Sequence, residues 1–329
     1  MNARRRFLET MRFGSPDRAP LFEEGLRDGV RERWTQEGLP ADADLAARFH
    51  YDARERVPVA LEPRGPSGGD PSSRRGLADL RRRLDAADPS RLPDDWPQRV
   101  RAWRTRRHVL ELPIHSGLFL TLGVGGWQTF EQAGCLLADE PGLVGEILAV
   151  HGEFAAAMAR RVLREVEVDF ASFSEPIGST FGPLISPRMY EDLVLPSYRP
   201  ILDALRAGGV ETIVLVTYAN ARSLLGGALA AGFNALWACE AGCDAMDYLS
   251  LRRQFGPDLR LIGGIDLDAL LAGEDAIARE IARTVPPLLA QGGYVPLADG
   301  RVRENVPFHA YRHYRALLEQ AAVAAGGGR

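Results

Sequence analysis

Short apolar runs alternate with longer helical segments along almost the whole of this 329-residue chain, and this alternation limits the folds it can adopt. Most runs are continuously apolar and end at polar residues or glycine, which is typical of strands buried on both faces of a parallel sheet. Glycines at 208, 232, 256 and 292 follow four of the helical segments, where a left-handed cap belongs. Strands are expected at 19–22, 109–114, 169–173, 212–216, 235–239, 260–265 and 294–297, and helices at 76–86, 141–165, 189–207, 221–231, 245–255 and 269–291.

Seven such strands indicate an α/β barrel, but a closed (β/α)8 barrel needs eight. The missing strand is expected between residues 50 and 110, where "RVPVALEP" (56–63) is a weaker candidate. Residues 64–98 are rich in Pro, Gly, Ser, Asp and Arg, which predicts an insertion. We therefore expect a single (β/α)8 TIM-barrel domain over residues 1–323, with an insertion around 64–98 and a disordered tail over 324–329.

The composition argues against several classes of protein. The net charge is −4 and no basic stripe is present, so no nucleic-acid partner is expected. We find no apolar run that looks long enough for a bilayer and no apolar signal core at the N-terminus, so we expect no membrane association and a cytoplasmic location. Every basic residue is arginine, which excludes a lysine Schiff base and lysine-bound pyridoxal phosphate. Three widely spaced cysteines argue against a disulfide framework.

Four phrases of the sequence resemble those of one known family. They are "RRRFLETMRFGSPDRAPLFE" (4–23), "GPLISPRMYEDLVLPSYRPILDALRAGG" (182–209), "ALWACEAGCDAMDYLSLRRQFGPDLRLIGGIDLDALLAG" (235–273) and "LLAQGGYVPLADGRV" (288–302). Together they resemble the uroporphyrinogen decarboxylase-like superfamily, which includes the haem-pathway decarboxylase and corrinoid-linked methyltransferases. The resemblance implies a (β/α)8 barrel with its site at the carboxyl ends of the strands.

Within that superfamily, the chain looks most similar to the methyltransferase and O-demethylase branch. The decarboxylases carry an arginine-rich phrase after the first strand, which grips the carboxylates of the substrate. Here the corresponding residues 23–28 read "EEGLRD". Two acidic residues, Glu23 and Glu24, at the position that binds the substrate's carboxylates in the decarboxylases would repel a polyanion. This argues against uroporphyrinogen as the substrate.

Two carboxylates are the catalytic candidates. Glu240 ends the apolar run "ALWAC", and the resemblance aligns it with a glutamate of the family. Glu175 follows "DFASFS", where the resemblance implies an acid pair of which this chain keeps one member. A carboxylate at a buried strand end is costly unless it is paired or catalytic, and either residue could protonate a leaving oxygen. A structural cap or salt bridge near Asp244 remains the alternative for Glu240.

Seven further residues are candidates for substrate contact, because they follow expected strands whose carboxyl ends would meet at one end of a barrel. The alternatives stay open for two of them: Asp266 also fits a helix N-cap, and His115 also fits a hydrogen-bonded residue of the barrel rim. The seven candidates are Glu23, Arg27, His115, Tyr218, Asn220, Asp266 and Asp299.

The resemblance also implies where zinc would bind in relatives that use it. Those relatives end the strand at 212–216 in a His-x-Cys pair and place a third ligand near the last strand, whereas this chain has Thr217, Ala219 and Gly300. Cys239 and Cys243 are spaced poorly for chelation and fit small buried residues. We therefore expect no metal ligands and no conventional zinc site.

Three functions are compatible with these residues. The first is methyl transfer from a small methylated or methoxylated substrate to a corrinoid or another acceptor, with a carboxylate as general acid. No corrinoid-binding phrase is present, so a partner protein would bring that cofactor. The second is cofactor-free decarboxylation or a lyase reaction on a small carboxylate held by arginines, and the third is small-molecule binding without catalysis. A homodimer is among the expected assemblies.

Overall fold

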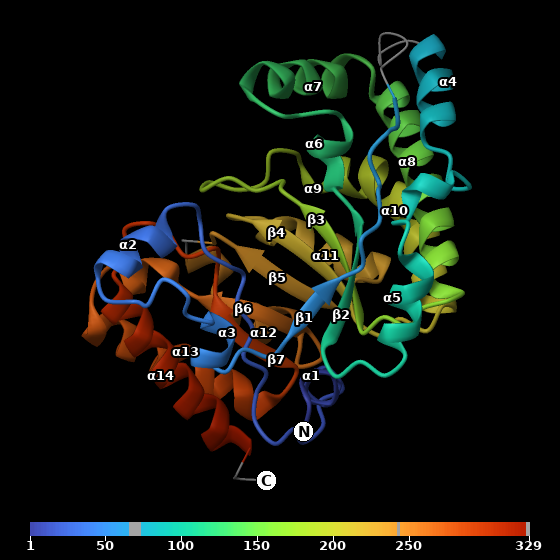
Figure 1. Cartoon of the computed structure of the whole chain (residues 1–329). Coiled ribbons are helices and arrows are strands. Elements are labelled where there is room, and N and C mark those ends of the chain that lie inside the picture. The colour runs from blue at the N-terminus through green and yellow to red at the C-terminus, as the bar shows by residue number, and fades with distance from the viewer. Residues whose placement is uncertain (66–73, 242–243, 327–329) are drawn as a thin grey trace.

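A computed structural model describes residues 1–65, 74–241 and 244–326, and a curled sheet of seven parallel strands forms its centre (Figure 1). The strand order follows the chain, and each strand pairs in parallel with the next. The strands are β1 (Arg54–Arg56), β2 (Val109–His115), β3 (Phe170–Glu175), β4 (Ile213–Tyr218), β5 (Ala235–Cys239), β6 (Arg260–Ile265) and β7 (Tyr294–Ala298).

The expected closed barrel of eight strands is not what the described residues form, because β1 and β7 are the two edges of a seven-stranded sheet. The segment expected as the first strand, 19–22, is not a strand. Pro20 has no N–H to donate, and the N–H of Leu21 bonds to the carboxylate of Asp52 at 2.8 Å instead of to a neighbouring strand. Further along the chain, Leu26 forms a single parallel bridge with Val302, which lies beyond the end of β7.

The other six expected strands are confirmed, with small differences at their ends. The extra strand, β1, lies slightly before the candidate "RVPVALEP" and overlaps it only at Arg56. Pro58 explains the displacement, because a proline within that phrase cannot donate a ladder hydrogen bond. Register places Arg54 opposite Val109 and Arg56 opposite Glu111, which sets the faces of these residues.

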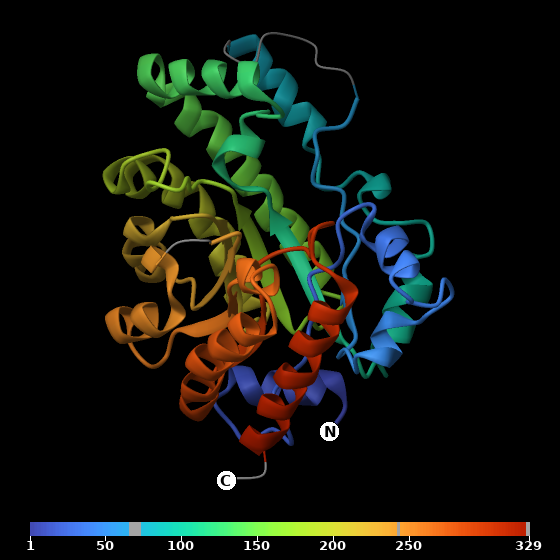
Figure 2. The ribbon, with the colours of Figure 1, turned by 90° about the vertical axis from the view of Figure 1, so that its left-hand side faces the viewer.

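Helices cover the outer face of the sheet (Figure 2). Every expected helix is present, although the chain enters several of them through a short 3-10 or π turn. Gly232 and Gly256 have φ of 119° and 99°, as expected at helix ends, whereas Gly208 has φ of −83°. The helices are α1 (Ala3–Met11), α2 (Val30–Gln36), α3 (Leu45–Arg48), α4 (Arg74–Arg83), α5 (Trp96–Trp103), α6 (Gly117–Thr121), α7 (Trp127–Asp139), α8 (Pro141–Leu163), α9 (Pro187–Met189), α10 (Leu195–Ala207), α11 (Leu225–Ala231), α12 (Tyr248–Phe255), α13 (Glu274–Gln291) and α14 (Phe308–Gly326).

Two of these helices qualify the sequence expectations. By length and composition α8 could cross a membrane, contrary to the expectation that no apolar run is long enough, but 56% of its most apolar window is buried within the protein. It packs against α10, as a core helix does. Helix α14 extends to Gly326, so residues 324–326 of the expected disordered tail are helical, and residues 327–329 lie outside the described part.

The apolar interior divides into two clusters, one on each side of the sheet. The inner cluster contains alternate residues of the strands, such as Val214, Trp237 and Leu297, and α1 closes its lower end with Phe7 and Met11 (Figure 1). The larger outer cluster joins the opposite faces of the strands to the helices. Successive side chains of a strand alternate between faces, so each residue of the site faces one cluster or the other.

Candidate active site

Four charged side chains gather on the inner face of the sheet at β1 and β2. The carboxylate of Glu111 accepts hydrogen bonds from Arg54 at 2.8 Å, from Arg56 at 3.1 Å and from the hydroxyl of Ser172 at 2.7 Å. Glu24 lies 3.4 Å from Arg54 and 4.0 Å from Arg56. Each arginine therefore bridges the carboxyl groups of Glu111 and Glu24.

Tyr218 joins these charges from the end of β4, on the same face as the last residue of β5. Its phenol interacts electrostatically with Glu24 and Arg56, and burial raises the pKa of Tyr218 to about 12. It therefore stays protonated at neutral pH and can donate a hydrogen bond. We call Glu24, Arg54, Arg56, Glu111 and Tyr218 the mouth cluster, because Arg56 and Tyr218 are the last residues of β1 and β4.

Glu24 is the member of the mouth cluster that comes from the segment before β1. Burial raises the pKa of Glu24 above its usual value, although Arg54 and Arg56 partly oppose this effect. A raised pKa is the property that suits a carboxyl group to donate a proton near neutral pH. Arg56 has 57% of its side chain exposed, so its guanidinium can also reach a ligand from solvent.

An aromatic surface lies beneath the charges. The guanidinium of Arg54 stacks 4.8 Å from the ring centre of Trp237 and 5.6 Å from that of Phe22. The indole N–H of Trp237 is buried and has no partner among the residues that the structure describes. A cation over an aromatic face is attracted to it, so the rings help to fix Arg54 in place.

Glu175, one of the two expected catalytic acids, faces the outer cluster instead of the mouth. It is 1% exposed, and its two oxygens accept hydrogen bonds from the N–H of Leu118, at 2.9 Å, and from the hydroxyl of Tyr198. Burial without a neighbouring cation raises the pKa of Glu175 to about 7. Through these two hydrogen bonds, Glu175 links β3 to α6 and α10.

His115 lies beside Glu175 on the same outer side. Its Nδ1 accepts a hydrogen bond from the N–H of Gly117 at 2.8 Å, and its ring centre lies 4.7 Å from that of Tyr198. Burial, together with the nearby His151, lowers the pKa of His115 to about 3. The ring is therefore neutral and directed away from the mouth cluster.

Glu240, the other expected acid, lies just past β5 at the rim. It is 45% exposed and forms an ion pair with Arg27, so the structure brings together two of the sequence candidates. Its backbone has a positive φ of 46°, which is uncommon outside glycine. Asp299 supports this turn, because its carboxylate accepts the N–H of Ala241 at 2.8 Å and of Leu267 at 3.1 Å.

The remaining candidates have local structural partners. The side chain of Glu23 is 8% exposed and accepts a hydrogen bond from the hydroxyl of Tyr311, on α14. Asn220 accepts the N–H of Arg222 at 3.2 Å. Asp266 caps the following 3-10 turn by accepting the N–H of Asp268 at 2.8 Å, in agreement with the capping alternative.

The positions considered for zinc ligands can be placed in the structure, apart from Cys243. Among the residues described, no group of three or more His, Cys, Asp or Glu side chains is arranged to hold a metal. Thr217 is fully buried on the outer face, in register with Glu175. A side chain at Gly300 would come within 3.2 Å of Glu240. Cys239 is a buried residue of the inner cluster, and Cys243 lies outside the described residues.

Sequence reasoning missed Glu24 and three further members of the mouth cluster: Arg54, Arg56 and Glu111. Two signals could have found them. "RER" alternates with the period of a strand, so its two arginines share a face. Glu111 interrupts the apolar run "VLELP", and a buried charge requires a partner.

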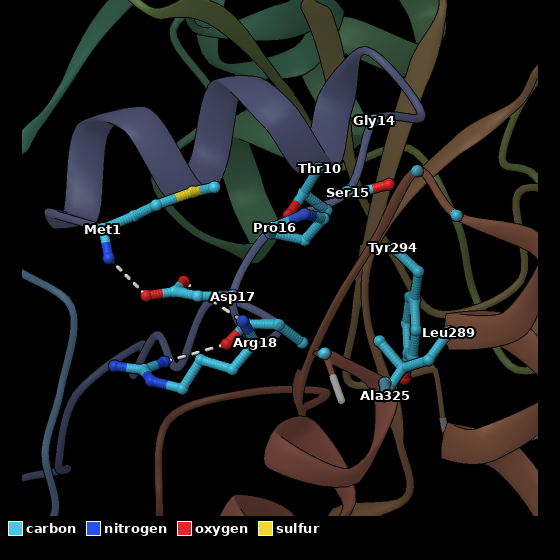
Figure 3. A pocket seen from close by; sticks show the side chains of 14 residues that line it. Met1, Thr10, Gly14, Ser15, Pro16, Asp17, Arg18, Leu289, Tyr294 and Ala325 are labelled. Carbon is cyan, nitrogen blue, oxygen red and sulfur yellow. Dashed lines mark hydrogen bonds and ion pairs between the residues drawn. The ribbon is translucent and has the colours of Figure 1, made fainter. Parts of the chain in front are cut away.

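A further cavity, of about 200 Å³, lies at the opposite end of the sheet (Figure 3). Its lining includes Tyr294, the first residue of β7, and the ion pair between the N-terminus and Asp17. The cavity therefore lies at the amino ends of the strands, whereas the active sites of parallel barrels lie at the carboxyl ends. We place it apart from the mouth cluster for this reason.

Comparison with known proteins agrees with this architecture. The uroporphyrinogen decarboxylase (URO-D) family model matches residues 120–296, which is more than half of the chain. A methyltransferase from Methanosarcina mazei has a similar structure, with a TM-score of 0.61 and 15% sequence identity over 97% of this chain and 99% of that one. No curated protein sequence matches significantly. The chain belongs to the uroporphyrinogen decarboxylase family.

Proposed function

We propose that this protein is a methyltransferase that removes a methyl group from a small methylated or methoxylated organic molecule bound at the mouth cluster. The observation that carries the proposal is the position of Glu24, a partly buried carboxyl group that lies 3.4 Å from Arg54 and 4.0 Å from Arg56 and has a raised pKa. The structural similarity to an archaeal methyltransferase supports the same reaction type. The geometry favours Glu24 as the general acid over Glu175 and Glu240.

The proposed step balances with one proton. A nucleophilic acceptor takes the methyl group, and the electron pair of the breaking carbon–oxygen bond stays on the substrate oxygen. Glu24 transfers its proton to that oxygen, which leaves as a hydroxyl group, and Tyr218 donates a hydrogen bond to it during the change. General acid catalysis of this kind contributes about 10²- to 10⁴-fold to a rate.

The other members of the mouth cluster position the substrate. Arg56 is half exposed and can pair with an acidic group of the substrate, while Glu111 keeps its guanidinium oriented. The rings beneath Arg54 are buried, so they hold Arg54 in place and do not themselves contact the substrate. Arg54 itself is held by Glu111 and Glu24, so it supports the acid rather than meeting the substrate.

A corrinoid in its Co(I) state, brought by a partner protein, is the methyl acceptor that we propose; it supplies the nucleophilic electron pair. The chain's own residues supply the acid and the substrate contacts.

Purified protein should be mixed anaerobically with cob(I)alamin and a panel of methoxylated aromatic acids. Formation of methylcobalamin with an equal amount of demethylated product is the expected result. Tyr218→Phe should slow the reaction, and the exposed variant Asp203→Asn should not. Failure of the whole panel, with cob(I)alamin remaining reduced, would contradict the proposal.

Decarboxylation without a cofactor is the second candidate, and the paired arginines of the mouth cluster favour it. Arg56 could hold the carboxylate of a small acid while Glu24 or Tyr218 protonates the carbon that loses CO2. Release of CO2 without added cobalamin would support this reaction, and Arg56→Met should then raise the KM for the acid.

A further inference from the structure

Two adjoining cavities lie on the outer side of β2, apart from the mouth cluster. The first, of about 130 Å³, is lined by residues of β2, α6 and α8, including His115 and Phe154. The second, of about 190 Å³, extends toward α4 and α7. The two cavities share the lining residues His151 and Thr121, and we call the two together the outer pocket.

One hydrogen-bond donor in the outer pocket is left unused. Because Nδ1 of His115 accepts the N–H of Gly117, the ring proton of the neutral imidazole is on Nε2. That nitrogen is buried and has no partner within the described part of the chain. Packing against Phe173 and Tyr198 fixes the ring. Buried donors are normally satisfied, so an acceptor is expected here.

The charges around the pocket favour a neutral ligand. Burial lowers the pKa of His115 to about 3 and that of His151 to about 4, so both rings are uncharged at neutral pH. Arg83, at the second cavity, directs its guanidinium to the carbonyls of Arg64 and Gly65, at 2.9 Å and 3.0 Å. Glu62 also lines the first cavity, where it is exposed to solvent, and most of the remaining lining is apolar.

We propose that the outer pocket binds a small neutral molecule that has an apolar, ring-sized body and an acceptor oxygen held by the Nε2–H of His115. An apolar cavity of roughly 150 Å³ is large enough for benzene, and each cavity here is comparable. Glu175 acts as a positioning residue for this pocket, because it holds the N–H of Leu118 and so fixes α6, which forms one wall. The inference is independent of methyl transfer at the mouth.

Acetophenone and ethylbenzene are matched probes, because they have similar shapes and only acetophenone has an acceptor oxygen. Calorimetric titration of the full chain should show that acetophenone binds about tenfold more tightly, a difference of about 1.4 kcal/mol. His115→Phe should remove this preference. Arg56→Met, in the mouth cluster, should leave both affinities unchanged.

Leu120→Trp provides a second variant that does not depend on the histidine, because Leu120 lines the pocket and is half exposed. It should weaken both probes if they bind here, and circular dichroism should show that each variant is folded. The proposal is overturned if neither probe binds at millimolar concentration, if the preference survives in His115→Phe, or if Arg56→Met abolishes binding.

Discussion

Glu111 and Glu175 are both buried carboxylates on neighbouring strands, yet the two faces of the sheet treat them differently. Glu111 is 2% exposed on the inner face and is bonded to two arginines and a serine. Glu175 is 1% exposed on the outer face, and its partners among the described residues are a phenol and a backbone N–H. The inner face compensates charge with charge, whereas the outer face uses neutral dipoles.

This difference separates a site that can hold ions from one that favours neutral groups. A buried carboxylate without a cation is easier to protonate, and burial accordingly raises the pKa of Glu175 to about 7. The inner face can accept a charged substrate, because its arginines and carboxylates are already arranged in pairs. Nearness to a strand's carboxyl end is therefore not enough to identify a catalytic residue, since the face also decides.

The largest change in stability is expected from Arg54→Met. It leaves Glu111 and Glu24 buried with less compensation, and removal of one partner of a buried ion pair costs about 3–5 kcal/mol of unfolding free energy. Urea denaturation measures this loss. Arg12→Met is the matched control, because its pair with Glu211 is more than half exposed, and it should cost less than about 1 kcal/mol. Equal losses in the two variants would contradict the account of the inner face.

A somewhat smaller effect, dependent on pH, is expected from Glu175→Gln. The folded pKa of Glu175 lies above the unfolded value, so the folded protein binds this proton more tightly. Its contribution to stability is fully present below about pH 4 and is lost as the pH rises through about 7. Glutamine does not titrate, so the variant does not lose this contribution as the pH rises. The unfolding free energy of the variant minus that of wild type should therefore increase by roughly 3 kcal/mol between pH 4 and pH 8.

Denaturation at a series of pH values gives this difference directly. Asp203→Asn, on the exposed side of α10, should show no such slope. A flat difference between wild type and Glu175→Gln would mean that Glu175 is compensated in the same way as the inner carboxylates.

The smallest effect is expected from Asp266→Ala. The carboxylate caps a 3-10 turn, so its loss should lower the unfolding free energy by about 1 kcal/mol. Turnover should not change, because the side chain has no partner in the mouth cluster. A large increase in KM with unchanged stability would instead indicate that Asp266 contacts the substrate.

Much of the fold could be predicted from the sequence, because continuous apolar runs and helical spacing are local signals. The segment 19–22 was the exception, since Pro20 and the carboxylate of Asp52 replaced the expected strand pairing. The position of β1 was also displaced, because three residues of "RER" carry no apolar signal.

The candidate site was harder to predict, because it depends on which face each side chain occupies. Tyr218 was correctly expected near the strand ends, and Glu240 and Arg27 meet at the rim. Glu175 was placed at the right strand end, but alternation along β3 directs it to the helices. The sequence did not indicate the role of the β1 arginines, because their partner, Glu111, is 55 residues or more away along the chain.

The most direct test of the account compares Glu24→Gln with Glu175→Gln and Glu240→Gln in methyl transfer to cob(I)alamin. The account predicts that Glu24→Gln lowers kcat/KM by about 100-fold or more, while the other two variants stay within about threefold of wild type. A loss of activity in Glu175→Gln together with near-normal turnover in Glu24→Gln would contradict it, and would move the reaction from the inner face of the sheet to the outer one.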